Sequence, residues 1–381
     1  MPHRRNIVYF IIFTLLFWTI GPLMVYIVDP YHIFHETRWN KNLWFGNKTL
    51  INLGQIETYL KRSNDYDGIL VGSSHTMNFK GSDLAKAVGA KGVLKLCGDG
   101  ISMDEIAWLS QAIIATYKVK SVFCTCEDFS MFPGNWYQSN KTYLSYPILS
   151  IVSFTSLENA FQVLWHKNLP SFSDLWTWDN LDNVHSWFGL WRGFNKKDHD
   201  FCLKGLRRLI TDVNYHNCHV EYQPNAPIVA QFNLSLLALF RNNPSVNFYV
   251  ISPPWAWSSF LHIKHHIRRT DLSYIYSCIF TLWRHLVTAC ADLPNVKIYG
   301  WHDCPFVSNL ANYCDESHYH PDINRYMAWC IEHDKHRLTK ENYDAYEARC
   351  VENLRAFKIL DSYPHRDTFD ELVTAEMQAG N

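Results

Sequence analysis

The sequence predicts an α/β protein: a three-layer α/β/α sandwich with about five parallel strands, preceded by one N-terminal transmembrane helix. Two observations carry this prediction. Short apolar segments alternate with helical patterns from about residue 67 onwards, which is typical of a parallel sheet covered by helices on both faces. Residues 7–28 form a run of 22 residues without a charge, long enough to cross a bilayer as a helix.

The residues around this apolar run predict an uncleaved membrane anchor. His3, Arg4 and Arg5 precede the run and Asp29 follows it, so the positive-inside rule predicts an N-terminus in the cytoplasm and export of the rest. The end of the run lacks the small-x-small pattern at which a signal peptide is cleaved. Pro22, which follows a glycine, is expected to kink the helix near its outer end.

Apolar segments of strand length and helical patterns follow one another in the exported part. The predicted strands are residues 68–71, 92–97, 120–126, 246–252 and 296–299. The predicted helices are residues 82–88, 102–117, 271–291 and 321–333. The second helix opens with a capping box formed by Ser102 and Glu105.

The alternation also divides the chain. The predicted parts are the cytoplasmic stub and anchor at 1–28, a connector at 29–66, a catalytic domain at 67–335 and a polar helical tail at 336–381. The domain is interrupted at about 132–243 by an insertion with few strand signals and one helical pattern at 192–213. We expect it to lie over the carboxyl ends of the strands, where open α/β sheets bind ligands. Its tryptophans either line a glycan groove or pack the insertion.

Composition excludes some classes of partner. The net charge is −1 and no long basic run occurs, so nucleic acid is a poor partner. The 15 Trp, 21 Tyr and 23 Phe suit sugar rings and membrane interfaces, or fill a core. Eleven cysteines show no zinc-binding spacing, and we expect neither a metal nor another cofactor. A bridge between Cys304 and Cys314 could stiffen the segment between them.

Two short segments supply the side chains of a nucleophilic centre. Residues 67–76 place Ser74 at the end of an apolar run, and residues 312–318 place Asp315 three positions before His318. A serine hydroxyl is a weak nucleophile until a base takes its proton. His318 can be that base when Asp315 holds its other ring nitrogen.

Other interpretations of these residues remain open. Ser73, Ser74 and His75 could form an ordinary turn, and His75 could compete as the base. His318 and His320 could bind a metal together with Asp322, although no third ligand of the usual kind is evident. His320 otherwise starts a helix or faces the substrate.

The two segments resemble those of the SGNH, or GDSL-like, hydrolase superfamily. In that superfamily the nucleophilic serine follows a Gly-Asp or Gly-Ser pair after the first strand, as Ser74 does, and an Asp-x-x-His block lies near the C-terminal end, as Asp315 and His318 do. The nucleophile elbow of the α/β-hydrolases does not fit, because Thr76 stands in place of its second glycine.

The resemblance also implies an oxyanion hole. Its donors would be the N–H groups of Ser74 and Gly98, with Gly100 as the second choice. The asparagine that the family carries after the third strand is absent here, where the chain has Asp128. The oxyanion hole would then rest on the N–H groups of Ser74 and Gly98 alone, and losing one such donor typically slows an enzyme about 100- to 1000-fold. Weak candidates for substrate binding are Ser73, His75, Asp128 and His320.

Within the superfamily, the chain resembles membrane-anchored proteins that modify bacterial envelope polymers, such as those of alginate O-acetylation and teichoic-acid D-alanylation. The shared features are the anchor, the segment 29–31 just outside it, Gly-Ser-Ser at 72–74, and Asn312 and Tyr313 before the Asp block. The resemblance covers about half of the exported part.

This resemblance implies a membrane-anchored serine acyltransferase or carbohydrate esterase in the periplasm, held by a single pass through the inner membrane. Its substrates would be an acyl donor and the O-acetyl groups of an envelope or extracellular polysaccharide. A multi-spanning membrane acyltransferase would be its partner in polysaccharide modification. The alternative is a non-catalytic glycan-binding or assembly subunit of such a complex.

Overall fold

The computed structural model describes residues 2–29, 66–76, 78–97, 101–126, 157, 160, 161, 164, 220–257, 272–309, 312, 313 and 318–357. The chain divides into two compact units, Met1–Asn64 with Asn135–Ser186 and Asp65–Gly134 with Trp187–Asn381. Nearly all of the predicted connector at 29–66 lies outside the described residues. The same is true of most of the insertion at 132–243, including the predicted helix at 192–213.

In the first unit the main described element is a long N-terminal helix, α1 (Pro2–Val28). Its segment Asn6–Val28 has a mean hydropathy of 2.2, so by length and composition it is able to cross a membrane. Large apolar side chains point outward along it, with Phe10 exposed to 72% and Phe13 to 71%. The helix continues through Pro22.

The second unit is a mixed α/β structure built on a six-stranded, mostly parallel sheet. Its strands are β1 (Gly68–Gly72), β2 (Val93–Cys97), β3 (Ser121–Thr125), β4 (Asn247–Ser252), β5 (Val296–Gly300) and β6 (Arg337–Leu338). Their order in the sheet is β2-β1-β3-β4-β5-β6. The first five strands are parallel and confirm the five predicted segments, whereas β6 pairs antiparallel with β5 and was not predicted.

Burial explains why these five segments could be recognised. Every residue of β1, β2 and β3 is buried, as expected for parallel strands with both faces covered. Lys95 in β2 is the one charged residue of these three strands, and its Nζ donates a 2.9 Å hydrogen bond to the carbonyl of Phe79. The buried amino group therefore has a hydrogen-bond partner.

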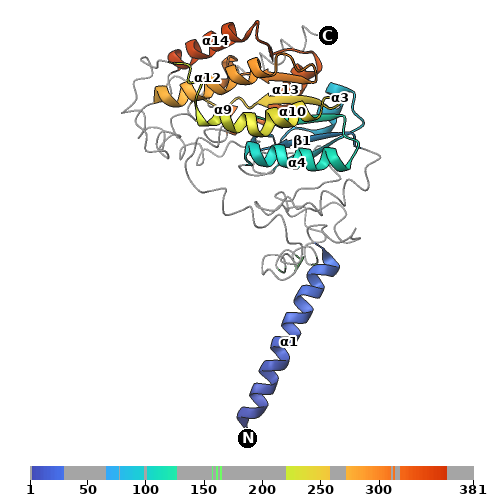
Figure 1. The fold of residues 1–381 in the computed structure, drawn as a ribbon. Coiled ribbons are helices and arrows are strands. Elements are labelled where there is room, and N and C mark those ends of the chain that lie inside the picture. Colours follow the sequence, from blue (N-terminus) through green and yellow to red (C-terminus); the bar gives the residue numbers. More distant parts are fainter. Residues whose placement is uncertain are drawn as a thin grey trace. The chain divides into compact units, whose positions relative to one another are not determined.

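Helices that connect the strands pack against the sheet and against each other (Figure 1). Those of the second unit that bear on the predictions are α3 (Gly81–Val88), α4 (Met103–Thr116), α12 (Leu272–Ala289) and α13 (Pro321–Glu332), which confirm the four predicted helices. The capping box is also confirmed, because Ser102 Oγ accepts from the N–H of Glu105 and the Glu105 carboxylate accepts from the N–H of Ser102.

One helical stretch lies where we expected part of the insertion. It consists of α9 (Pro227–Phe232), η6 (Asn233–Leu237) and α10 (Ala238–Asn242), and it leads directly into β4. It packs against α4, and α10 and α4 run side by side (Figure 1). Residues 227–242 thus form the last helical part of the connection from β3 to β4.

Residues 336–357 pack onto the same unit as the sheet. They contain β6 and α14 (Tyr343–Ala356), so the described part of the predicted tail holds a short strand as well as a helix. The helix lies beside α12 and buries a stripe of side chains at helical spacing (Figure 1): Tyr343, Tyr346, Cys350 and Leu354. Arg284 of α12 pairs with Asp344 and Glu347 of α14.

Candidate active site

Ser74 lies at the carboxyl end of β1, in the short 3-10 turn η1 (Ser74–Thr76). Thr76 closes this turn by donating to the Ser73 carbonyl from both its N–H, at 3.0 Å, and its hydroxyl, at 2.8 Å. A Cβ atom on Gly72 would lie 2.6 Å from Thr76 Oγ1 and 3.0 Å from the Thr125 side chain, so only glycine fits there. The turn therefore depends on Gly72 and Thr76.

The sheet order places this turn where α/β sheets bind ligands. Strand β1 lies between β2 and β3, so the chain moves to one side of β1 for β2 and to the other side for β3. Ligands of open α/β sheets bind outside the carboxyl ends of strands at such a switch point. Ser74 is at this point, and its side chain is partly exposed.

His318 comes from a loop that is fastened to the same edge of the sheet. Tyr313 and Tyr319 form an isolated antiparallel β-bridge, which holds the chain on both sides of His318. The Tyr313 hydroxyl donates to the Pro254 carbonyl beyond β4 at 2.6 Å. The Tyr319 hydroxyl donates to the His75 carbonyl at 2.8 Å, which ties the loop to the Ser74 turn.

These anchors bring the predicted nucleophile and base together. Ser74 Oγ and His318 Nε2 are 2.8 Å apart, within hydrogen-bond distance. Both side chains are partly exposed. Because Nε2 faces the hydroxyl, Nδ1 is the nitrogen that the predicted Asp315 would hold. Asp315 lies outside the described residues, as do Gly98, Gly100 and Asp128.

Ser73 and His75 form a second serine–histidine pair beside the first. Ser73 Oγ lies 3.0 Å from His75 Nδ1 and accepts from the N–H of His75 at 3.2 Å. Both residues are buried. The His75 ring stacks on the His318 ring, with centroids 4.7 Å apart and planes at 21°. The geometry therefore pairs His75 with Ser73 and not with Ser74. Because both side chains are buried, neither is exposed for the substrate contact that was predicted for them.

His320 lies at the start of α13. Its Nδ1 accepts from the N–H of Asp322 at 3.2 Å, so the side chain caps the helix. Of the two roles considered for His320, the structure shows helix capping. Among the described residues, His318, His320 and Asp322 do not converge as metal ligands.

Sequence reasoning missed two residues that hold the site. Tyr319 and Asn324 both donate to the His75 carbonyl, the latter at 3.3 Å. Asn324 is 1% exposed on a helix face otherwise made of apolar residues. A polar residue on that face was the available signal, because buried amides need hydrogen-bond partners.

The structure describes eight of the eleven cysteines. All eight are buried, and no disulfide joins any two of them: Cys97, Cys124, Cys126, Cys278, Cys290, Cys304, Cys330 and Cys350. Cys314 lies outside the described residues, so the bridge considered between Cys304 and Cys314 stays a prediction. No protein-family model, no curated protein and no solved structure matches the chain.

Proposed function

We propose that the chain is a membrane-anchored serine acyltransferase or esterase acting on O-acyl groups, most simply O-acetyl groups, of a bacterial envelope or extracellular polysaccharide. The 2.8 Å contact between Ser74 Oγ and His318 Nε2 carries this proposal. A hydroxyl at the switch point of a parallel sheet, paired with a partly exposed imidazole from a distant segment, is the arrangement that nucleophilic catalysis requires.

The proposed reaction has two steps. Ser74 Oγ attacks the acyl carbonyl carbon while its proton passes to His318 Nε2, and that proton then leaves with the alcohol of the donor. The acyl group is now an ester on Ser74. An acceptor hydroxyl gives its proton to His318 and attacks this ester, and His318 returns the proton to Ser74 Oγ. With a sugar hydroxyl as acceptor the protein is a transferase, and with water it is an esterase.

The remaining parts of the site follow from the resemblance to SGNH hydrolases. In this proposal the second unit is an SGNH-type three-layer sandwich, and Asp315 orients His318. The N–H groups of Ser74 and Gly98 would bind the oxyanion. The parallel order of β1 to β5, with the serine after β1 and the histidine just before α13, supports it.

We further propose that α1 anchors the protein in the inner membrane with its N-terminus in the cytoplasm. The length and hydropathy of Asn6–Val28 support a span, and Arg4 and Arg5 support this orientation. The catalytic unit would then face the periplasm. A multi-spanning membrane protein would deliver acyl groups to it.

An acetyl-transfer assay on the full-length protein in detergent tests the proposal. With 4-nitrophenyl acetate, we expect a burst of one nitrophenol per chain and one acetyl group on the peptide that contains Ser74. Ser74→Ala should lose both signals, and Ser73→Ala should keep them. Adding an oligosaccharide acceptor then separates the two activities, because acetylated sugar indicates a transferase and acetate alone an esterase.

The same assay also tests the alternative that the protein is a non-catalytic subunit. The absence of the family asparagine after β3 favours a glycan-binding or assembly subunit. A folded wild-type protein that gives no burst and no acetylated peptide, yet binds acetylated polysaccharide as tightly as Ser74→Ala does, would support that alternative.

A further inference from the structure

A group of three potential metal ligands lies at the same carboxyl edge of the sheet as Ser74, but beyond β5 and not beyond β1. Asp303 and Cys304 follow β5 within four residues, and His336 directly precedes β6. The two segments meet because β6 pairs with β5, and the N–H of Gly300 donates to the His336 carbonyl at 3.2 Å. Strand pairing thus brings together side chains that are 32 residues apart.

The three ligand atoms are close enough to share one ion. Cys304 Sγ lies 3.8 Å from His336 Nδ1 and 3.9 Å from Asp303 Oδ1, and all three atoms lie within 4.8 Å of one another. Tetrahedral zinc, with bonds of about 2.0–2.3 Å, holds its ligand atoms about 3.5 Å apart. The two distances from Cys304 Sγ exceed this spacing by only a few tenths of an ångström.

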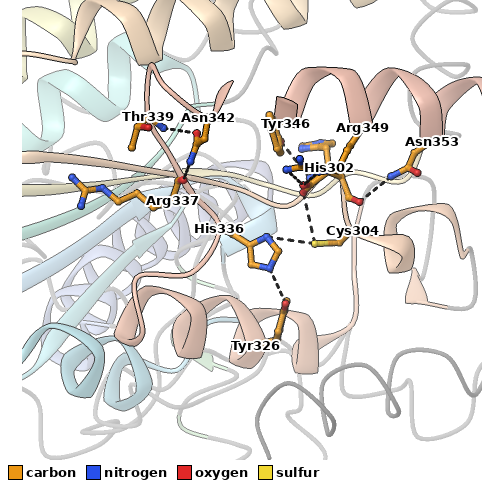
Figure 2. A network of polar contacts seen from close by, with 11 residues as sticks. His302, Cys304, Tyr326, His336, Arg337, Thr339, Asn342, Tyr346, Arg349 and Asn353 are labelled. Carbon is orange, nitrogen blue, oxygen red and sulfur yellow. Dashed lines mark hydrogen bonds and ion pairs between the residues drawn. The ribbon is translucent and has the colours of Figure 1, made fainter. Parts of the chain in front are cut away.

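Neighbouring residues orient two of these ligands from outside. Figure 2 shows the His336 ring between Cys304 and Tyr326, and the Tyr326 hydroxyl lies 2.9 Å from Nε2. Arg349 donates to Asp303 Oδ2 from Nε at 3.0 Å and Nη2 at 2.8 Å. Metal-binding histidines and carboxylates characteristically have such second partners, which fix the ring and the carboxylate.

The backbone at both ligand segments is also held in place. The Asp303 carbonyl accepts from the Asn353 side chain of α14 at 2.9 Å. His336 has a φ of 56°, a left-handed conformation that residues with side chains rarely adopt. The segments that carry the ligands are therefore fixed by contacts from α13, α14 and β5.

We propose that Asp303, Cys304 and His336 bind a zinc ion, with water as the fourth ligand. One thiolate, one imidazole and one carboxylate suit zinc, whereas calcium and magnesium prefer oxygen ligands alone. Bound zinc would join the end of β5 to β6 and stabilise the folded state. The site is separate from Ser74, because β3 and β4 lie between β1 and β5 and three strand spacings span about 14 Å.

Metal content of the full-length protein in detergent tests this site. After removal of metals with a chelator and exposure to zinc chloride, we expect one zinc per chain in the wild type. Cys304→Ser and Asp303→Asn should retain almost none. Cys290→Ser is the matched control, since Cys290 is also a buried thiol, and it should retain one zinc. Cobalt in place of zinc should give a thiolate charge-transfer absorption that Cys304→Ser lacks.

A second variant keeps the test decisive if the ligand variants do not fold. Tyr326→Phe removes only the hydroxyl beside His336 Nε2 and should weaken zinc binding about 10- to 100-fold. Zinc should also raise the melting temperature of the wild type and not that of Asp303→Asn. Equal zinc retention by wild type and Cys304→Ser, an unchanged affinity in Tyr326→Phe, or a folded wild type that retains no zinc would each overturn the proposal.

Discussion

Two serine–histidine pairs lie side by side at the carboxyl end of β1, and they differ in how they are built. Ser74 and His318 are 244 residues apart in the chain and meet at 2.8 Å with both side chains partly exposed. Ser73 and His75 are two residues apart and meet at 3.0 Å with both side chains buried. A similar distance between hydroxyl and imidazole thus occurs in two different environments.

The difference shows that hydrogen-bond distance alone does not identify a nucleophile. The Ser73 hydroxyl already accepts from the N–H of His75, and no substrate reaches a buried pair. Ser74 is accessible, and its histidine arrives on a separate loop held by Tyr313 and Tyr319. In this account the buried pair supports the exposed one, since the His75 ring stacks on the His318 ring.

The same substitution at each histidine gives the largest expected contrast. His318→Phe removes the proposed base and should lower the acylation rate about 100- to 10,000-fold. His75→Phe keeps an aromatic ring for stacking and removes one buried hydrogen bond, so its rate should fall by less than about tenfold. Stopped-flow measurement of the nitrophenol burst compares the two. Equal losses would mean that the pairs do not have distinct roles.

Gly72 tests whether the turn must approach the sheet closely. Gly72→Ala would bring a methyl group against Thr76 and Thr125, so we expect a loss of about 1–3 kcal/mol in stability and at least a tenfold slower acylation. Gly89→Ala is the control, because Gly89 has a φ of 66° with open space around it. It should lose about 1–2 kcal/mol through backbone strain and acylate at the normal rate.

A third imidazole, that of His302, extends the comparison. It is buried, and its ring has no hydroxyl partner among the described residues. Its ring lies 4.4 Å from that of Trp283, and among the described residues neither ring nitrogen has a hydrogen-bond partner. Burial lowers the pKa of His302 to about 3, below the usual 6.5. The unfolded chain therefore binds the proton first, and this contribution to stability is lost as pH falls from 6.5 towards 3.

The loss amounts to about 1.4 kcal/mol per pH unit, or about 2 kcal/mol at pH 5. His302→Phe should remove this dependence, so the difference in stability between variant and wild type should move in favour of the variant between pH 7 and pH 5. Denaturant unfolding at a series of pH values measures it. Parallel curves for the two proteins would contradict a neutral buried imidazole.

The smallest expected effect concerns the contact that links the two pairs. Tyr319→Phe removes the hydroxyl that donates to the His75 carbonyl, while Asn324 still donates to it. We expect a loss of about 1 kcal/mol in stability and an acylation rate a few-fold lower. Tyr343→Phe removes a comparable hydroxyl contact to the Phe280 carbonyl far from the site, and it should lose stability without a change in rate.

Local patterns predicted the elements that bury apolar runs or carry a capping motif. The five parallel strands, the helices that follow them and the Ser102–Glu105 capping box were recognised in this way. The strand β6 was missed because two residues form no apolar run. Residues 227–242 were assigned to an insertion because the whole stretch 132–243 has few strand signals.

The candidate site, like the fold, was predicted from the sequence only in part. The order of the serine and histidine blocks predicted that Ser74 would meet His318. The contacts of Tyr319 and Asn324 with the His75 carbonyl depend on how a loop and a helix pack, which spacing does not encode. Asp303, Cys304 and His336 show no ligand spacing either, because β6 alone brings the last of them to the end of β5.

Labelling of the full-length protein with a fluorophosphonate serine probe, mapped by mass spectrometry, tests the central claim most directly. We predict modification at Ser74 in the wild type and in Ser73→Ala. No modification is expected in Ser74→Ala, and little in His318→Phe. Labelling at Ser73, or labelling of Ser74 that persists unchanged in His318→Phe, would contradict the claim that His318 activates Ser74.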